Sequence, residues 1–182
     1  GGVYNDAAQE LIFANMRIRR EREGDFRAML GTCRMAEARI KEVVDRFGID
    51  VITESIDQLM ERNERRMRQA ISQLPQGEYY HETYMESGKV DLEPKRVFLK
   101  MTVEQDSITA DFDGSSPQSN GPNNVGPGLL PSGVFAITKS FLDPDADINH
   151  GSLRPITVTA PVGTVTNCRL PAPCGGSAEV TF

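Results

Sequence analysis

The spacing of hydrophobic residues changes at Pro75 to Gly77, and this change divides the 182-residue chain into two kinds of secondary structure. Before it, apolar residues recur every three or four positions, which is the period of an amphipathic helix. After it, apolar and polar residues alternate, as they do in a strand with one buried face. We therefore predict an α+β fold, with a helical subdomain at residues 1–75 and a β-rich subdomain at residues 76–182.

The helical subdomain is expected to contain about three helices. Gly24 is the expected C-terminal stop of the first helix, and Asp25 is the expected N-cap of the second. The second helix carries apolar residues on one face and should end at Gly48. The expected helices span residues 5–22, 26–47 and 51–74.

The β-rich subdomain is expected to form a mostly antiparallel sheet with one further helix. A short turn at Gln105 and Asp106 should join two strands into an antiparallel hairpin. The expected strands span residues 78–86, 97–103, 108–112, 156–159 and 164–166. The further helix is expected at residues 131–142, with Val134, Ile137, Phe141 and Leu142 on its buried side.

Charge and composition exclude several classes of protein. The formal net charge is −6, and because basic and acidic residues balance through Leu74, the whole deficit falls on the second part. An acidic part without a basic stripe argues against nucleic acid, and no apolar stretch is long enough to cross a membrane. Three cysteines without a CxxC pair indicate a reduced, cytoplasmic protein, and two histidines make a self-contained metal site unexpected.

The loop after the predicted hairpin, residues 111–128, is the first candidate for binding. Its glycines permit positive φ and its prolines restrict φ, so the loop should have a defined shape. The substrate-binding candidates in it are Asp113, Gln118, Asn120 and Asn123. Amide side chains both donate and accept hydrogen bonds, which suits a cyclic amide. The alternative is a structural turn network, since Asp and Asn also bond to their own backbone.

A second polar group contains Asn149, His150 and Arg154. Arg154 is a candidate for binding a substrate carboxylate through its planar guanidinium group, and His150 for transferring protons near neutral pH. The alternative is ordinary loop capping with an exposed histidine.

Other reactive side chains have structural alternatives that the sequence favours. The arginines at 65, 66 and 68 could meet nucleotide phosphates of a partner, but a solvated face with helical ion pairs is the preferred interpretation. The thiols of Cys33, Cys168 and Cys174 have no basic neighbour in sequence, so we interpret them as buried or incidental.

Short phrases in a particular order give the chain a resemblance to the hydantoinase B/5-oxoprolinase family, which also includes subunits of acetone and acetophenone carboxylases. The phrases cover nearly the whole chain, although each alone would be weak. They are Gly24-Asp-Phe-Arg-Ala28, Glu64-Arg-Arg-Met-Arg68, Leu74-Pro-Gln-Gly77, Asp111-Phe-Asp-Gly-Ser-Ser-Pro-Gln118, Gly121-Pro-Asn123, Asp143-Pro-Asp145, Asn149-His-Gly151, Arg154-Pro155, Ala160-Pro-Val-Gly163 and Pro171-Ala-Pro173.

The resemblance implies part of a hetero-oligomeric, ATP-dependent enzyme. Family members pair with a hydantoinase A-type subunit or domain that resembles actin-like ATPases and would bind ATP and Mg. The shared chemistry activates an amide or ketone carbonyl, after which water opens a small cyclic amide or a ketone is carboxylated. The hydrolase is the leading expectation, with a carboxylase subunit or a non-catalytic scaffold as alternatives. The resemblance leaves open the substrate and the subunit stoichiometry.

One family motif has no counterpart in this chain. The family has an earlier glycine motif with histidine and aspartate, associated with its divalent metal, and nothing like it precedes Gly24. We therefore expect a middle portion of a longer polypeptide, inactive by itself. No metal is expected within this portion, and its catalytic residues are not assigned.

Overall fold

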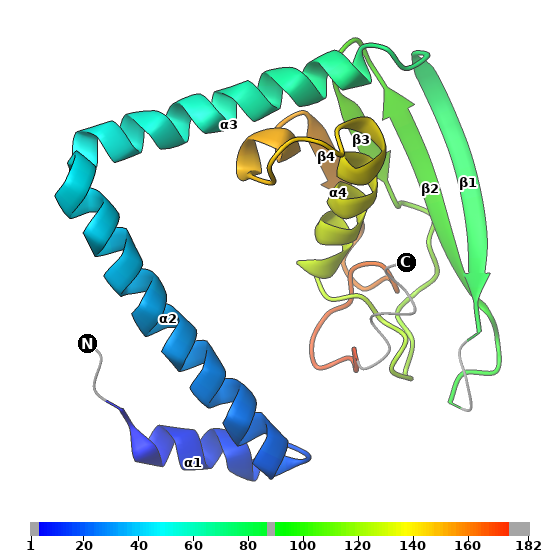
Figure 1. The fold of residues 1–182 in the computed structure, drawn as a ribbon. Coiled ribbons are helices and arrows are strands. Elements are labelled where there is room, and N and C mark those ends of the chain that lie inside the picture. The colour runs from blue at the N-terminus through cyan, green and yellow to red at the C-terminus, as the bar shows by residue number, and fades with distance from the viewer. Residues whose placement is uncertain (1–3, 87–89, 175–182) are drawn as a thin grey trace. The chain divides into compact units, whose positions relative to one another are not determined.

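The computed structural model describes residues 4–86 and 90–174 and has the predicted α+β fold (Figure 1). Two compact units form, Gly1–Ile56 and Asp57–Phe182. The predicted subdomains, residues 1–75 and 76–182, were divided by their type of secondary structure, and this division stays a prediction. The elements are α1 (Asp6–Ala14), α2 (Arg19–Phe47), α3 (Ile49–Ile71), β1 (Gly77–Met85), β2 (Lys95–Val103), β3 (Ile108–Asp111), α4 (Leu129–Leu142), η1 (His150–Leu153) and β4 (Ile156–Thr159).

The first two helices meet earlier than the sequence predicts. The chain leaves α1 at Asn15, whose side-chain amide donates to the Leu11 carbonyl at 2.8 Å. Ile18 takes a left-handed conformation with φ of 57°, and α2 starts at the next residue. The predicted stop at Gly24 and N-cap at Asp25 are therefore wrong, because both residues lie inside α2.

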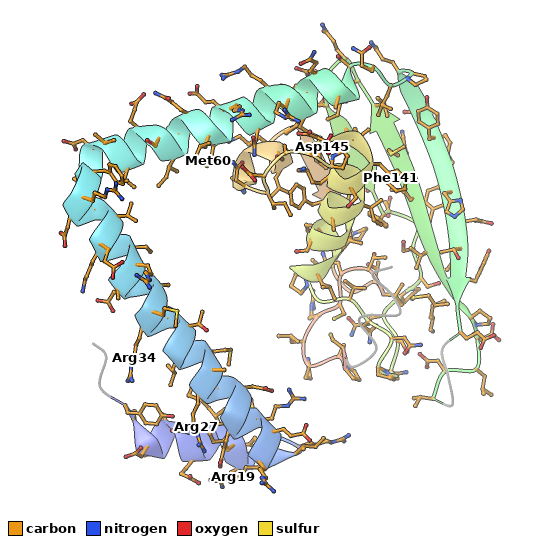
Figure 2. The ribbon with its side chains drawn as sticks, viewed as in Figure 1. Arg19, Arg27, Arg34, Met60, Phe141 and Asp145 are labelled. Carbon is orange, nitrogen blue, oxygen red and sulfur yellow. The ribbon has the colours of Figure 1, made fainter. Side chains whose placement is uncertain are left out.

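A charged cluster holds this corner, and the pairs of Arg22 with Asp25 and of Arg27 with Glu23 bridge the helix across Gly24. Arg19, labelled in Figure 2, pairs with Glu10 of α1 at 2.6 Å and with Glu23 of α2 at 2.7 Å. A glycine inside a helix costs about 1 kcal/mol relative to alanine, so local contacts can outweigh it. The other predicted stop is confirmed, since Gly48 follows α2 with φ of 81°.

The apolar face predicted for the second helix is exposed within its own unit. No residue of α2 is buried, and Met29, Ile40 and Phe47 expose half or more of their surface. The helical spacing therefore predicts the helix but not the burial of its apolar side.

The sheet has the order β1-β2-β3-β4. The first two pairings are antiparallel and β3 pairs with β4 in parallel, so the sheet is mostly antiparallel as predicted. The predicted hairpin is confirmed, and Glu104 N–H donates to the Ser107 carbonyl at its turn. The predicted strand at residues 164–166 is wrong, because Thr164 forms only isolated bridges with Pro117 and Asn167.

The core of the second unit lies between the end of α3 and the sheet. Met67 and Ile71 of α3 are fully buried against Val103 and Ile108 of the β2–β3 hairpin. Burying each such side chain contributes roughly 1.5–3 kcal/mol. This contact joins the helix to the strands from which the candidate loop begins.

Helix α4 lies in front of the sheet (Figure 1), and its buried side differs from the prediction. Phe141 is 82% exposed and Ile137 is 47% exposed, so their predicted burial is wrong within the described residues. Lys139 is buried instead, and its Nζ donates to the carbonyls of Asp143 and Ala146. A lysine in the last turn stabilises carbonyl groups that have no partner within the helix.

Candidate functional site

The candidate loop begins with a turn held by Asp111 at the end of β3. Its Oδ1 accepts from the Asp113 N–H at 3.1 Å and from the Thr159 hydroxyl of β4 at 2.8 Å. Gly114 follows with φ of +92°, and an added Cβ would lie 3.3 Å from the Phe98 ring. Both the conformation and the close ring favour glycine at this position.

A fully buried amide, Asn124, holds the interior of the loop. Its Oδ1 accepts from the Ser119 N–H at 2.7 Å. Its Nδ2 donates to the carbonyls of Ser119, Gly121 and Pro173 at 2.9, 3.0 and 2.9 Å. One side chain thus satisfies four backbone groups in a dry interior, which fixes the path of the loop.

Asp91, in the connection before β2, anchors the same loop from outside. Its Oδ2 accepts from the Ser119 hydroxyl at 2.6 Å and from the Asn120 N–H at 3.0 Å. The Lys95 ammonium lies 3.4 Å from the same oxygen. The Ser119 hydrogen bond is the main cause that lowers the pKa of Asp91. Sequence reasoning did not single out Asp91 and Asn124, because neither is in a motif. The bonds of Asp91 to Ser119 and of Asn124 to Pro173 join residues that are far apart in the chain.

The segment after β4 forms the other wall of the loop. Gln118 N–H donates to the Gly163 carbonyl at 2.8 Å, and Gln118 Oε1 accepts from the Arg169 N–H at 2.8 Å. Val125 N–H donates to the Val165 carbonyl at 2.8 Å. The loop is therefore held on both sides, and its shape depends on the segment near residues 163–174.

The predicted substrate-binding residues of this loop lie at its outer side. Asp113 and Asn120 are exposed, whereas Gln118 and Asn123 are half-buried. Asp113 Oδ1 accepts from the Gly114 N–H at 2.9 Å, and Asn123 Nδ2 donates to the Glu86 carbonyl at 2.7 Å. Their contact with substrate stays a prediction.

A cavity of about 620 Å³ lies between the sheet and α4, and Asn123 is part of its lining. Its walls are mainly apolar, with Leu99, Met101, Phe112 and Val134 among them. No basic side chain occurs among the described residues that line it. An apolar cavity of this size with a few polar groups has the character of a small-molecule site.

The second polar group is packed against α3. Asn149 Oδ1 accepts from the Gly151 N–H at 2.9 Å, and its Nδ2 donates to the Leu59 carbonyl at 3.3 Å. A Cβ on Gly151 would lie only 1.9 Å from the carbonyl oxygen of Met60, which Figure 2 labels on α3. The Asn-His-Gly phrase therefore permits a close backbone contact, while His150 is exposed.

Arg154 also contacts α3. Its Nη1 lies 2.9 Å from Glu64 Oε2, and Arg68 Nη2 lies 2.8 Å from Glu64 Oε1. These two guanidinium groups, Arg154 first, lower the pKa of Glu64. The roles of Asn149 and Arg154 toward substrate stay predictions, because both side chains have structural partners here.

The arginines of α3 make ion pairs within the chain. Arg66 binds Asp143 through two bonds, of 2.5 and 3.1 Å, and is the main cause that lowers the pKa of Asp143. Arg68 lies 3.3 Å from Asp106 and Arg65 lies 3.5 Å from Glu61. This favours the ion-pair interpretation over a role in nucleotide binding.

Two features are absent from the described residues. No three His, Cys, Asp or Glu side chains in residues 4–86 and 90–174 are grouped so that they could hold a metal ion. In the same part of the chain, no helix combines the length and the apolar character needed to cross a membrane.

Comparison with known proteins assigns the chain to a class of B-type subunits and domains. The family model for Hydantoinase B/oxoprolinase matches residues 1–182. The chain belongs to the hydantoinase B/oxoprolinase family, as the resemblance implied.

Two relatives are similar over most of this chain. A protein of Pseudomonas sp. (strain NS671), assigned as the B-type subunit of a D-/L-hydantoinase, is 29% identical over 94% of this chain and 31% of its own length. The crystal structure of the ATP-dependent caprolactamase from Pseudomonas jessenii matches with a TM-score of 0.81 and 28% identity, over 94% of this chain and 30% of that one. The chain thus spans less than a third of either relative.

A third similarity concerns the fold alone. The nucleotide-free structure of acetone carboxylase matches with a TM-score of 0.72 and 21% identity, over 83% of this chain and 22% of that one. The fold is therefore shared with a carboxylase as well as with the caprolactamase.

Proposed function

We propose that this chain is part of the B-type component of an ATP-dependent cyclic-amide hydrolase. The similarity in sequence and fold to the ATP-dependent caprolactamase, over 94% of the chain, is the observation that supports this most strongly. The protein that carries this chain would work with an A-type ATPase subunit or domain in the cytoplasm. By itself the chain would be inactive.

The chemistry explains why such an enzyme needs ATP. A stable amide is a poor electrophile, and transfer of a phosphoryl group from ATP to the amide oxygen would supply a leaving group. ATP and Mg would be bound by the partner, because Arg65, Arg66 and Arg68 of α3 are already paired with carboxylates. The task of this chain would be to bind and orient the amide and to limit its contact with water.

The cavity beside Asn123 is the proposed place for the substrate. Asn123 Nδ2 bonds to the Glu86 carbonyl, so its Oδ1 remains as an acceptor for an amide N–H. The apolar walls would contact the ring carbons. Asp113, Gln118 and Asn120 do not line this cavity, and they would meet polar groups of the substrate only in the assembled enzyme. Asn149 and Arg154 would hold the neighbouring segment on α3 rather than reach the ring directly.

Two other functions remain as alternatives. The fold shared with acetone carboxylase is compatible with a ketone carboxylase subunit. The many backbone bonds of the loop are compatible with a scaffold that forms subunit contacts while chemistry occurs elsewhere.

ATP hydrolysis by the full-length protein, co-expressed with its ATPase partner, separates the two reactions. We expect phosphate release to be stimulated by caprolactam, hydantoin or 5-oxoproline without added bicarbonate. Stimulation by acetone that requires bicarbonate, with no response to cyclic amides, would overturn the proposal. Assembly is checked by size-exclusion chromatography, so that a failed complex is recognised.

A further inference from the structure

Two thiols that are apart in sequence meet beside the candidate loop. Cys168 Sγ and Cys174 Sγ lie 3.2 Å apart, and both cysteines are reduced. Cys168 is 3% exposed, whereas Cys174 is partly exposed. The spacing of these residues is not that of a CxxC motif, so no local motif indicates the pair.

The loop itself holds both thiols in place. Cys168 N–H donates to the Val125 carbonyl at 2.9 Å, and the carbonyl of Pro173 accepts from Asn124 Nδ2 at 2.9 Å. Two adjacent residues of the loop therefore fix the backbone at each end of the segment. A third bond, from Ala172 N–H to the Arg169 carbonyl at 3.1 Å, shapes the turn between the cysteines.

We propose that Cys168 and Cys174 are a modification site, a dithiol that hydroperoxides convert to a disulfide. A disulfide bond is about 2 Å long, so the sulfurs must approach by roughly 1 Å. Cys174 is the more exposed partner, so a small adjustment there can bring the sulfurs together. Cys33 provides an internal control, because it is exposed on α2 and has no described thiol neighbour.

The reaction has two balanced steps. Hydrogen peroxide first oxidises the Cys174 thiol to a sulfenic acid, and the peroxide O–O bond breaks with release of water. Cys168 sulfur then attacks Cys174 sulfur, the S–O bond breaks, and a second water leaves with the Cys168 proton. In total the two thiols lose two protons and two electrons, which reduce one peroxide to two waters.

The environment of the two thiols supports this order. Burial, and then the hydrogen bond with Cys174, raises the pKa of the Cys168 thiol to about 11. Because the thiolate is the reactive form, buried Cys168 is a poor first target for peroxide. The more accessible Cys174 is therefore the site of the first oxidation, and Cys168 resolves it.

The disulfide would close the segment that supports the loop. The segment from Cys168 to Cys174 carries the Arg169 N–H that bonds Gln118 and the Pro173 carbonyl that bonds Asn124. A bond between Cys168 and Cys174 would restrict movement of this segment away from the loop. This consequence concerns loop stability and does not depend on the proposed function.

Peroxide treatment of the full-length protein tests the proposal. Thiol titration and peptide mass spectrometry should show a Cys168–Cys174 cross-link that forms with loss of two hydrogens and reverses with dithiothreitol. Cys33→Ser should form the same cross-link, whereas Cys168→Ser and Cys174→Ser should each lack it. Amide exchange at Asn124 and Val125 should slow in the oxidised protein.

Several results would contradict the proposal. One is that peroxide oxidises Cys174 to the sulfinic acid and no cross-link forms. Another is that the cross-link that peroxide forms contains Cys33. If Cys168→Ser does not fold, Cys174→Ser decides the matter because its side chain is only partly buried. A cross-link that still forms in Cys174→Ser, or unchanged amide exchange after oxidation, would also count against it.

Discussion

The loop at residues 111–128 and the segment at residues 149–154 have similar polar compositions, but they use it differently. In the segment, Asn149 and Arg154 are bonded to η1 or α3, whereas His150 is exposed. In the loop, buried Ser119 and Asn124 hold the backbone, while Asp113 and Asn120 stay exposed. Burial thus distinguishes the polar side chains within the loop, whereas in the segment even the exposed Arg154 has a structural partner, Glu64.

This difference suggests a division of labour within the second unit. The segment at residues 149–154 packs against α3, and Gly151 makes the closest approach, to the backbone of Met60. The loop combines a rigid interior with an outer side that includes Asn123 at the cavity. Substitutions in the segment and in the loop test whether the two regions differ in this way.

Gly151→Ala should destabilise the second unit most. Its Cβ would lie 1.9 Å from the Met60 carbonyl oxygen, so the backbone of η1 or α3 must move. Overpacking against backbone is expected to cost about 3 kcal/mol or more, measured by chemical denaturation. Gly126→Ala is the matched control, since a Cβ there meets nothing within 4 Å. Equal stability of the two variants would refute the close contact.

Asn124→Ala should have the next largest effect. It removes four hydrogen bonds in a fully buried position and leaves backbone groups without partners. The expected loss of stability is about 3 kcal/mol, seen in denaturation and in faster amide exchange across the loop. Asn120→Ala, at an exposed position in the same loop, should change stability by less than about 0.5 kcal/mol. Similar losses in both variants would mean that the loop has no rigid interior.

Acidification should weaken the contact between α3 and the end of α4. Arg66 lowers the pKa of Asp143, so the folded state holds this carboxylate ionised more strongly than the unfolded chain does. The stabilisation is present above the ordinary Asp pKa of about 4, and it is lost as pH falls through the lower folded value. Asp143→Asn should therefore reduce the decline in Tm between neutral and strongly acidic pH. The effect should be smaller than that of Asn124→Ala, because the Arg66 side chain is 41% exposed and solvent screens the pair. An unchanged decline would exclude this pair as a contributor.

Local signals in the sequence were sufficient for most elements of the fold. The tyrosine- and threonine-rich residues 78–86 and the turn at Gln105 and Asp106 correspond to β1 and to the β2–β3 hairpin. The Gly24 stop was wrong because a glycine inside a helix costs only about 1 kcal/mol, and the pairs Arg22–Asp25 and Arg27–Glu23 bridge α2 across it.

The candidate site could be predicted only in part. Asn123 and Asn124 are identical neighbours in sequence, yet one lines the cavity and the other is fully buried. Their difference depends on the Glu86 and Pro173 carbonyls, which are distant in sequence. Local composition identifies such a loop, but tertiary contacts decide which of its amides point inward.

The central question is whether the outer side of the loop faces substrate. The most direct test is to measure the steady-state turnover of a cyclic amide by the full-length enzyme with its ATPase partner. Asn123→Ala should lower kcat/KM about tenfold, which corresponds to loss of one hydrogen bond of ~1.4 kcal/mol. Asp113→Ala should lower it as well, while subunit assembly and Tm stay near those of the wild type. Unchanged kcat/KM in both variants, with assembly intact, would contradict a substrate-facing loop and leave it a structural turn network.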